Sequence, residues 1–521
     1  MEFKVTLNSK SNLNELIFFW LPRASVVTES GRRASVPCLQ AVTLARGNEK
    51  NLAIFSCKHD LLFFKMKINI SHLGAVNQAN IDLKPLTVFV GDNGTGKTWT
   101  AYTLLAIFGE YGLQKYLESY LDGKTKQSYP ILDKAIQQFF NQGNAQISLV
   151  QFAKNYAEKY FNEIARLTPE WMRAFLGTER VSFDELRVYI KLGDLKTAYL
   201  EKIKAVKLNA QLSSALNDNP LIHIYKEKSK SRLYFYSEGN ALKELPARVV
   251  KNFIIGQVFQ ILHKNLYIIV YPFPTERTIT FPFKLRQLDL FETKETDKKT
   301  GKPLQFFTNM IGRAFLKNSD DRKAESQESP NIQNYINLAN ILETEILGGN
   351  VDFESQSLDK KLLFKLTDKK TQLEMPIVSS MVKELAAFVL YLRHVAKPNE
   401  WLIIDEPEMN LHPTAQVKFA EFLAMLVNAE LKILITTHSP YIVDHLSNMM
   451  KAAQHDDKEQ IKDLFYLENT NAFISQENVS MYLFEDGTAK NILNENGVVD
   501  WSTFGNVSKD IADIYPQLIT D

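Results

Sequence analysis

The chain has 521 residues, of which 45% are hydrophobic and 23% charged, a balance typical of a globular protein with about two or three lobes. Its formal net charge of +1 gives no general electrostatic argument for binding nucleic acid or a membrane. The only two cysteines, Cys38 and Cys57, argue against a disulfide scaffold or a cysteine zinc site. No apolar run approaches the length of a membrane span, and no export signal is recognisable, so we expect a cytoplasmic protein.

Residues 1–65 carry scattered apolar clusters and no clear period. Two explanations remain open for them: an added N-terminal extension, or an upstream part of the gene model with Met66 as the true start. In either case we expect poor order there. A strand-like segment at residues 66–73 and a second strand near 79–83 then begin the main fold.

A glycine-rich segment, GDNGTGKT at residues 91–98, follows an apolar run at 86–90 and precedes a helical pattern. Strand, glycine-rich turn and helix in this order are the context of a phosphate-binding loop, and a turn that matches by chance is the alternative. In such a loop, backbone N–H groups wrap a polyphosphate and the helix N-terminus adds a favourable dipole. We expect Lys97 to reach the β- and γ-phosphates and the Thr98 hydroxyl to hold Mg²⁺. The predicted nucleotide-binding residues of the loop are Gly91, Asn93, Gly94, Thr95, Gly96, Lys97 and Thr98.

Residues 109–261 are expected to form a mainly helical inserted lobe between two segments of the main fold, 66–108 and 262–521. Apolar residues recur with helical spacing at 135–140, 149–161 and 171–176, whereas 186–192 and 233–236 are strand-like. No heptad pattern persists, which argues against long coiled-coil arms.

A short basic run lies in this lobe, with Tyr225 and Tyr234 on either side of it. It consists of Lys226, Lys228, Lys230 and Arg232. Such a run predicts either a phosphate-binding patch or the solvated tip of a hairpin.

Beyond the lobe, residues 266–270 are strand-like, and two polar segments at 292–302 and 318–330 predict mobile surface loops. A helix is expected near 332–347. Strands are expected near 351–354, 361–366, 463–467 and 479–484, and a last helix near 511–518.

An apolar strand at residues 401–404 ends at two carboxylates, Asp405 and Glu406. Asp405 fits the acid that orients Mg²⁺ and its waters, and Glu406 fits a base that orients an attacking water. A further buried strand at 431–437 ends at His438, which we expect beside the γ-phosphate. Each feature has an ordinary alternative, namely a solvated acid at a strand end and a structural histidine.

Together these segments resemble the ABC-type ATPase heads of the SMC, RecF and OLD families. The resemblance lies in the loop at 91–98, in IDEPE at 404–408, in NLHP at 410–413 and in THSP at 437–440. It implies an α/β fold with a mixed sheet around the phosphate-loop helix, with ATP and Mg²⁺ as cofactors. It also implies a homodimer or higher homo-oligomer that closes around nucleotide, with Lys97, Glu406 and His438 as catalytic residues and Thr98 and Asp405 as metal ligands.

The segment SSMVKEL at residues 379–385 lies where this family keeps its signature motif. There the signature serine binds the γ-phosphate that the opposite subunit holds. The paired glycines of the transporter pattern are missing, so both Ser379 and Ser380 are candidates. A serine N-cap before a helix at 382–394 is the alternative.

The segment YPFPTER at residues 271–277 resembles a pattern in OLD-like stand-alone ATPases, several of which act in anti-phage systems of the Septu and PARIS type. The resemblance implies that Glu276 or Arg277 approaches the Mg²⁺–nucleotide site, and a proline-rich turn with a surface salt bridge is the alternative. It further implies a sensor or scaffold that controls an effector protein, a nuclease or a toxin.

Other functions compete with this interpretation. A RecF- or SMC-like ATPase in DNA repair would make nucleic acid the partner, and a scaffold that binds ATP with little turnover is a further alternative. A built-in nuclease is not expected, because little chain follows His438 and part of it completes the sheet.

Overall fold

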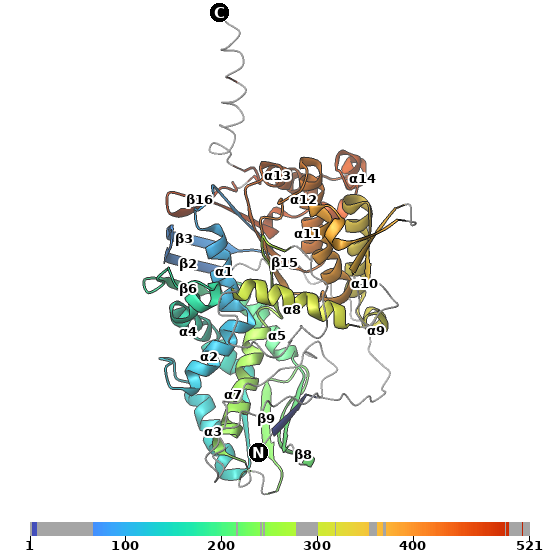
Figure 1. Cartoon of the computed structure of the whole chain (residues 1–521). Coiled ribbons are helices and arrows are strands. Elements are labelled where there is room, and N and C mark those ends of the chain that lie inside the picture. The colour runs from blue at the N-terminus through green and yellow to red at the C-terminus, as the bar shows by residue number, and fades with distance from the viewer. Residues whose placement is uncertain are drawn as a thin grey trace, which may run out of the picture. The chain divides into compact units, whose positions relative to one another are not determined.

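The computed structural model describes residues 3–7, 66–214, 217–239, 242, 245–277, 301–317, 319–353, 362–367, 371–494, 496–499 and 513 (Figure 1). The chain divides into two compact units. The small unit comprises Met1–Leu62, Ser119–Ala157 and Lys196–Asn265. The large unit comprises Phe63–Glu118, Glu158–Leu195 and Leu266–Asp521.

The large unit is built on a mixed sheet of nine strands among the described residues. In spatial order these are β10 (Val270–Phe273), β14 (Trp401–Asp405), β15 (Lys432–Thr437), β4 (Leu86–Val90), β16 (Val479–Glu485), β17 (Thr488–Asn491), β3 (Val76–Leu83), β2 (Met66–Leu73) and β6 (Arg187–Lys191). The first five run parallel to one another, and β2 pairs antiparallel with both β3 and β6. The predicted α/β fold with a mixed sheet is therefore confirmed.

The parallel strands explain how distant motifs meet. Every residue of β4 and β14 is buried, as expected for strands covered on both faces. In the ladder, Thr437 lies opposite Val90 and Thr436 lies opposite Asp405. The carboxyl ends of β4, β14 and β15 therefore lie at one edge of the sheet, and the segments that follow them begin there.

Helices complete the large unit. They include α1 (Lys97–Phe108), α8 (Lys302–Leu316), α10 (Pro330–Ile341), α11 (Ser380–Leu390), α12 (Pro413–Asn428) and α13 (Pro440–Ala453). Residues of β4, β14, β15 and most of these helices share one hydrophobic core. A small antiparallel sheet joins β11 (Gly349–Phe353), β12 (Leu362–Leu366) and β13 (Gln372–Glu374). The helices α2 (Glu110–Leu121) and α4 (Leu149–Leu176) have residues in both units.

Three sequence expectations in the large unit are wrong. The polar segment at 318–330 contains a helix, α9 (Ser319–Glu328), because buried Arg322 donates hydrogen bonds to the carbonyl oxygens of Leu392 and Ala396. Residues 463–467 form no strand, since a 3₁₀ turn at Lys462–Leu464 follows α14 (Lys458–Ile461) and further turns follow it. The strand expected at 266–270 begins only at Val270.

Some expectations fall largely or wholly outside the described residues. These are the poor order of residues 1–65, apart from 3–7, the polar segment at 292–302, apart from its last two residues, and the final helix near 511–518, apart from Asp513. Within the described residues, no helix is both long and apolar enough to cross a membrane.

The small unit contains an antiparallel sheet as well as helices, so it is richer in strands than the expected mainly helical lobe. The strand order is β1 (Phe3–Leu7), β7 (Leu208–Ser214), β8 (Asn217–Lys226), β9 (Arg232–Ser237) and β5 (Asn144–Ser148). The helices are α3 (Pro130–Gln142), α5 (Leu195–Ala205) and α7 (Ala247–Lys264). Strand β9 shows why a sheet forms here: Leu233 and Phe235 are buried, whereas Tyr234 and Tyr236 lie on the other face.

The structure corrects the interpretation of the basic run. Lys226 is 1% exposed, and its Nζ donates hydrogen bonds to the carbonyl oxygens of Lys204 and Val206, each at 2.7 Å. Burial lowers the pKa of Lys226 to about 8. The ammonium group of Lys226 therefore stabilises the local backbone and cannot contact a phosphate. Lys228 and Lys230, in contrast, are exposed on the turn between β8 and β9.

Candidate functional site

The loop between β4 and α1 has the backbone that only glycine adopts easily. Gly91 has φ 140°, and a Cβ atom there would lie 2.4 Å from the carbonyl oxygen of Phe484. Gly96 has φ 96°, and a Cβ atom there would lie 2.5 Å from a methyl group of Val76. These two positions therefore require glycine, and they let the loop turn tightly into the N-terminus of α1.

Lys97 folds back over this loop. It is 4% exposed, and its Nζ donates to the carbonyl oxygens of Gly91 at 2.8 Å and Asp92 at 2.7 Å. Burial lowers the pKa of Lys97, and the nearby carboxylates of Glu406 and Asp405 oppose that shift. The ammonium group is thus held inside the turn that a polyphosphate would enter, close to the acids at the end of β14.

Asp405 is the centre of a hydroxyl network at the end of β14. The hydroxyl of Thr98 donates to its Oδ1 at 2.8 Å, although the two residues are 307 positions apart. The hydroxyl of Thr436 also donates to Oδ1, and that of Thr275 donates to Oδ2 at 2.7 Å. Burial raises the pKa of the neighbouring Tyr102, whose hydroxyl also bonds to Asp405. The structure therefore brings together Thr98 and Asp405, the two predicted metal ligands.

This donor set fits Mg²⁺, which prefers hard oxygen ligands and is usually held by one or two protein groups, waters and substrate phosphates. A hydroxyl and a carboxylate oxygen in contact, beside a phosphate-binding loop, are the ligands that such a site needs. Within the described residues, no group of three or more His, Cys, Asp and Glu side chains is arranged to hold a metal ion.

Glu406 and His438 lie side by side at the same edge. His438 Nε2 is 3.5 Å from Glu406 Oε1, and both side chains are partly exposed. The contact with His438 lowers the pKa of Glu406. Glu406 also has φ 47°, a left-handed backbone that costs a non-glycine residue about 1–3 kcal/mol and is concentrated at functional sites. Its N–H donates to the carbonyl oxygen of Thr436 at 3.0 Å, which holds that conformation.

Glu408 positions the backbone of the histidine. Its Oε1 accepts a hydrogen bond from the backbone N–H of His438. Burial raises the pKa of Glu408, and this hydrogen bond opposes the shift. The segments that follow β14 and β15 are therefore tied together directly.

Arg277 lies behind the acid pair. It is fully buried, and its guanidinium donates to the carbonyl oxygens of Asp405 at 2.8 Å and Glu406 at 3.0 Å. It also pairs with Glu384 of α11 at 3.2 Å, and Glu384 accepts a further hydrogen bond from Asn410. The surface salt bridge considered for this segment is therefore wrong. Arg277 reaches the backbone of the site from inside, while Glu276 is exposed.

Replacing Arg277 by methionine should lower the free energy of unfolding by about 3–5 kcal/mol, because Glu384 would keep a buried charge without its partner. Burial already raises the pKa of Glu384, and Arg277 opposes that shift. Adding Glu384→Gln to Arg277→Met should therefore recover part of the loss in urea denaturation. If the double variant is no more stable than Arg277→Met, the ion pair with Glu384 is not the source of the stability that Arg277 contributes.

Ser379 and Ser380 lie at the start of α11. Ser379 is its N-cap, with its Oγ accepting from the N–H of Val382 at 3.4 Å, and Ser380 is the first helical residue. Both are exposed. Among the described residues, no hydrogen bond joins either serine to Lys97, Asp405 or His438. The N-cap alternative is confirmed for Ser379, and the role of either serine toward nucleotide stays a prediction.

Several residues of this site escape analysis of the sequence alone. Thr436 is the penultimate residue of β15, and Thr275 lies two residues after β10. The register that places Thr436 opposite Asp405 is visible only once the strands are paired. Glu384 could have been noticed as a lone acid in the apolar stretch from Val382 to Leu390. Its partners, Arg277 and Asn410, lie in segments that the sequence singled out, but nothing in the sequence indicates that they pair with Glu384.

A family model described as "AAA ATPase domain" matches residues 66–443 of the chain. Solved structures with a similar fold include the SmcHead bound to the C-winged helix domain of ScpA, with 12% identity, 82% of this chain and 97% of that chain covered, and a TM-score of 0.30. The SMC head domain from Thermotoga maritima has 9% identity, coverage of 82% and 98%, and a TM-score of 0.28. An Smc head domain bound to the C-terminal domain of ScpA, derived from Pyrococcus furiosus, has 12% identity, coverage of 87% and 99%, and a TM-score of 0.32. A search of curated proteins gives no match.

Proposed function

The chain belongs to the AAA ATPase domain family, and from this premise we propose that it is a cytoplasmic ATPase whose large unit hydrolyses ATP with Mg²⁺ as an ABC-type head. The observation that carries the proposal is the convergence on one sheet edge of Lys97, the Thr98–Asp405 pair and the Glu406–His438 pair. These are the groups that phosphoryl transfer to water requires: a cation for the phosphates, oxygen ligands for the metal and a carboxylate for the water.

Each group has a distinct task in this proposal. The loop N–H groups and Lys97 hold the phosphates, while Thr98 and Asp405 hold Mg²⁺, which neutralises charge that develops on the phosphoryl oxygens. Glu406 orients the attacking water as a carboxylate, and the contact with His438, which lowers the pKa of Glu406, further favours this charged form. His438 lies against Glu406 and, in this proposal, responds to the γ-phosphate. Arg277 and Thr275 position Asp405 and the backbone of Glu406 from behind.

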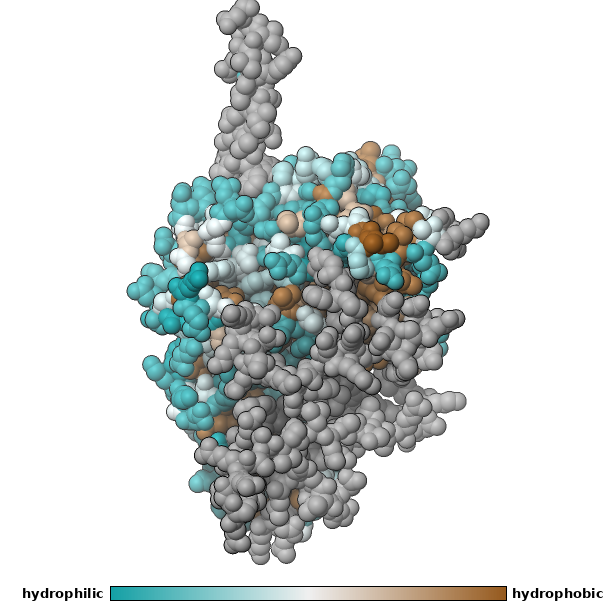
Figure 2. All heavy atoms as spheres, in the orientation of Figure 1, coloured by the Kyte–Doolittle hydropathy of each residue, from teal (hydrophilic) through white to brown (hydrophobic). Residues whose placement is uncertain are grey.

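We further propose that two copies close around nucleotide, with Ser379 or Ser380 of one copy completing the site of the other. Both serines are exposed, as a residue that reaches into the site of a second copy must be. Two large apolar side chains are exposed in the segments that hold these groups: Ile377, two residues before Ser379, is 70% exposed, and Met409, three residues after Glu406, is 38% exposed. Figure 2 shows a hydrophobic patch in the part of the large unit where Figure 1 labels α10 and α11. Closure that depends on ATP would bury such surface only when nucleotide is present.

A mixing experiment tests the shared site. Lys97→Ala removes phosphate binding, whereas Ser379→Asn with Ser380→Ala removes both hydroxyls and keeps an N-cap residue for α11. Each variant alone should be inactive, and an equal mixture should regain ATPase activity, because a mixed dimer contains one intact composite site. Absence of recovery, with ATP-bound protein sedimenting as a monomer, would contradict the shared site.

The biological output that we propose is control of an effector protein, such as a nuclease or a toxin, in anti-phage defence of the OLD-like kind. Its support is the resemblance of residues 271–277 and of the site motifs to stand-alone ATPases of such systems. An ATP-bound closed assembly is the state expected to hold the effector, so a variant that binds ATP without hydrolysing it tests this part by capture.

A further inference from the structure

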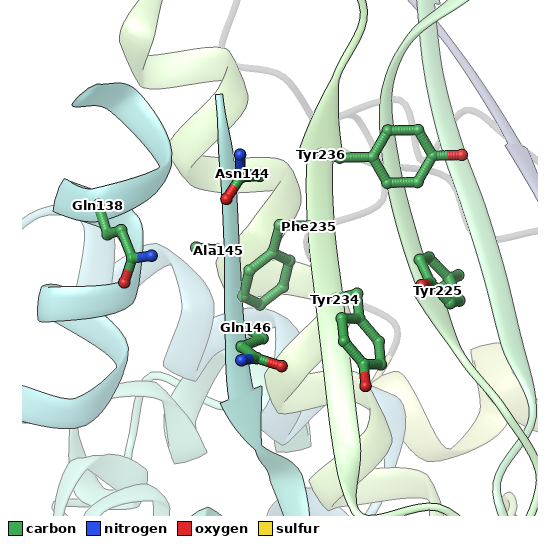
Figure 3. Close-up of a pocket in the computed structure, with 8 residues that line it drawn as sticks. All are labelled: Gln138, Asn144, Ala145, Gln146, Tyr225, Tyr234, Phe235 and Tyr236. Carbon is green, nitrogen blue, oxygen red and sulfur yellow. The ribbon is translucent and has the colours of Figure 1, made fainter. Parts of the chain in front are cut away.

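The small unit carries a pocket that the ATPase site does not use. It has a volume of about 350 Å³ and lies on the sheet between β8, β9 and β5, with Gln138 of α3 at its side (Figure 3). Three tyrosines, Tyr225, Tyr234 and Tyr236, line it together with three amide side chains, Gln138, Asn144 and Gln146. Rings and amides on one open face are a chemistry different from that of the phosphate loop.

The strand register arranges these side chains in two rows. Tyr225 of β8, Tyr234 of β9 and Gln146 of β5 lie opposite one another in the first row. In the second row, His223, Tyr236 and Asn144 take the same places. Each row therefore offers an aromatic pair beside an amide, and successive rows are separated by two residues, about 7 Å along the strand.

The rings are already parallel. Tyr225 and Tyr234 stack with centroids 4.9 Å apart and an interplanar angle of 13°, and His223 and Tyr236 stack at 4.4 Å and 5°. Tyr236 lines the pocket and is 37% exposed, whereas His223 is buried and does not line it. The pocket thus reaches Tyr236 but not His223, and a flat ring that enters it can contact Tyr236.

Positive charge lies at one end of these rows. Arg232 precedes Tyr234 by two residues on the same face of β9, and its guanidinium donates to Gln146 Oε1 at 3.2 Å. Lys228 and Lys230 are exposed on the adjoining turn, where Glu227 is the one acid between residues 227 and 232. A polyanion with flat rings at regular intervals is complementary to this order of cations, rings and amides.

We infer that this face of the small unit binds single-stranded nucleic acid. Bases stack on Tyr234 and Tyr236, the amides of Asn144, Gln146 and Gln138 hydrogen-bond to base edges, and Arg232, Lys228 and Lys230 contact the backbone phosphates. Stacking of this kind tolerates any base, because every base has an aromatic face, and it requires strands whose bases are unpaired. The site is separate from the proposed ATP site, and its test does not depend on that proposal.

The experiment measures fluorescence anisotropy of the full chain with labelled single-stranded DNA and RNA of one sequence, with the matching DNA duplex, and with AMP as competitor. Saturable binding of a single strand is expected, with weaker binding of the duplex. AMP should not compete at the nucleotide concentration at which the unlabelled strand displaces half of the labelled strand. The DNA and RNA arms identify which strand is preferred.

Tyr234→Ala should weaken binding about tenfold or more. Lys228→Gln with Lys230→Gln should make the slope of log Kobs against log salt shallower by about 1.4.

Two further variants distinguish a loss of binding contacts from a loss of structure. Asn144→Ala with Gln146→Ala leaves the ring stacks intact and should still weaken binding by several-fold. Tyr189→Ala removes a strand tyrosine that is 54% exposed on β6 of the large unit, and it should bind as the wild type does. The inference is overturned if neither single strand binds, if Tyr234→Ala in folded protein binds normally, if the duplex binds as tightly as the single strand, or if AMP competes as well as the polymer.

Discussion

Lys97→Ala is expected to reduce the affinity for ATP by about 100-fold or more and to remove measurable hydrolysis. In the structure, the Lys97 ammonium donates to the carbonyl oxygens of Gly91 and Asp92, two acceptors that phosphate oxygens can replace. Two charge-assisted hydrogen bonds at about 1.5–3 kcal/mol each account for a loss of this size. Titration calorimetry with ATP and Mg²⁺ measures the effect directly.

Lys490→Ala is the matched control, because Lys490 is an exposed lysine on β17 in the same sheet. It should bind ATP as the wild type does. A thermal melt of Lys97→Ala separates a local effect from unfolding, since Lys97 is buried and its removal leaves two loop carbonyls without their donor. Folded Lys97→Ala that still binds ATP with wild-type affinity would remove the phosphate-binding role of this loop.

The convergence of the site could be predicted from sequence because its determinants are local. The runs at residues 86–90, 401–404 and 431–437 are mainly apolar without a polar residue at every second position, which is the pattern of strands buried on both faces. Parallel neighbours bring their carboxyl ends to one edge, so the polar residues after each run meet there. The ladder pairs β14 with β15 and β15 with β4, as this argument requires.

The supporting contacts could not be predicted in the same way. Arg277 is separated by 107 positions from Glu384, and Thr275 by 130 from Asp405, so no local period relates the members of either pair. A buried arginine in a proline-rich segment has the same sequence signal as an exposed one. Lys226 shows the converse error: within a run of exposed cations, one lysine is buried by backbone carbonyls that only the folded lobe brings near.

Tertiary contacts also decided the elements that were predicted wrongly. Residues 318–330 are polar enough for a loop, yet the hydrogen bonds of Arg322 to the carbonyl oxygens of Leu392 and Ala396 anchor α9. The lobe at 109–261 was predicted to be mainly helical because its apolar residues recur with helical spacing. Its strands are partly exposed and give a weaker pattern. The alternation in β9 was visible, but its pairing partners, β5 and β8, were not predicted as strands from the sequence.

Glu406→Gln is expected to lower the rate of ATP hydrolysis by about 10²–10⁴-fold while ATP binding is retained. Glutamine keeps the size of the side chain and removes its negative charge, so the attacking water loses its acceptor and the phosphate loop is untouched. A glutamate carboxylate is ionised at neutral pH, and the contact with His438 lowers the pKa of Glu406 further, so the substitution removes a negative charge. Single-turnover hydrolysis and ATP titration of the same preparation measure the two effects separately.

The same variant should accumulate the closed assembly, because ATP stabilises that state by mass action and is no longer consumed. Sedimentation with ATP and Mg²⁺ should therefore show dimers or larger species for Glu406→Gln and mostly the open form after the wild type has exhausted its ATP. Glu485→Gln, at the turn of the β16–β17 hairpin, is a matched control that should behave as the wild type. Used as bait, the closed Glu406→Gln assembly should retain an effector that Lys97→Ala fails to retain. If Glu406→Gln hydrolyses ATP at the wild-type rate, a group other than Glu406 orients the attacking water. The contact between Glu406 and His438 would then have only a structural role.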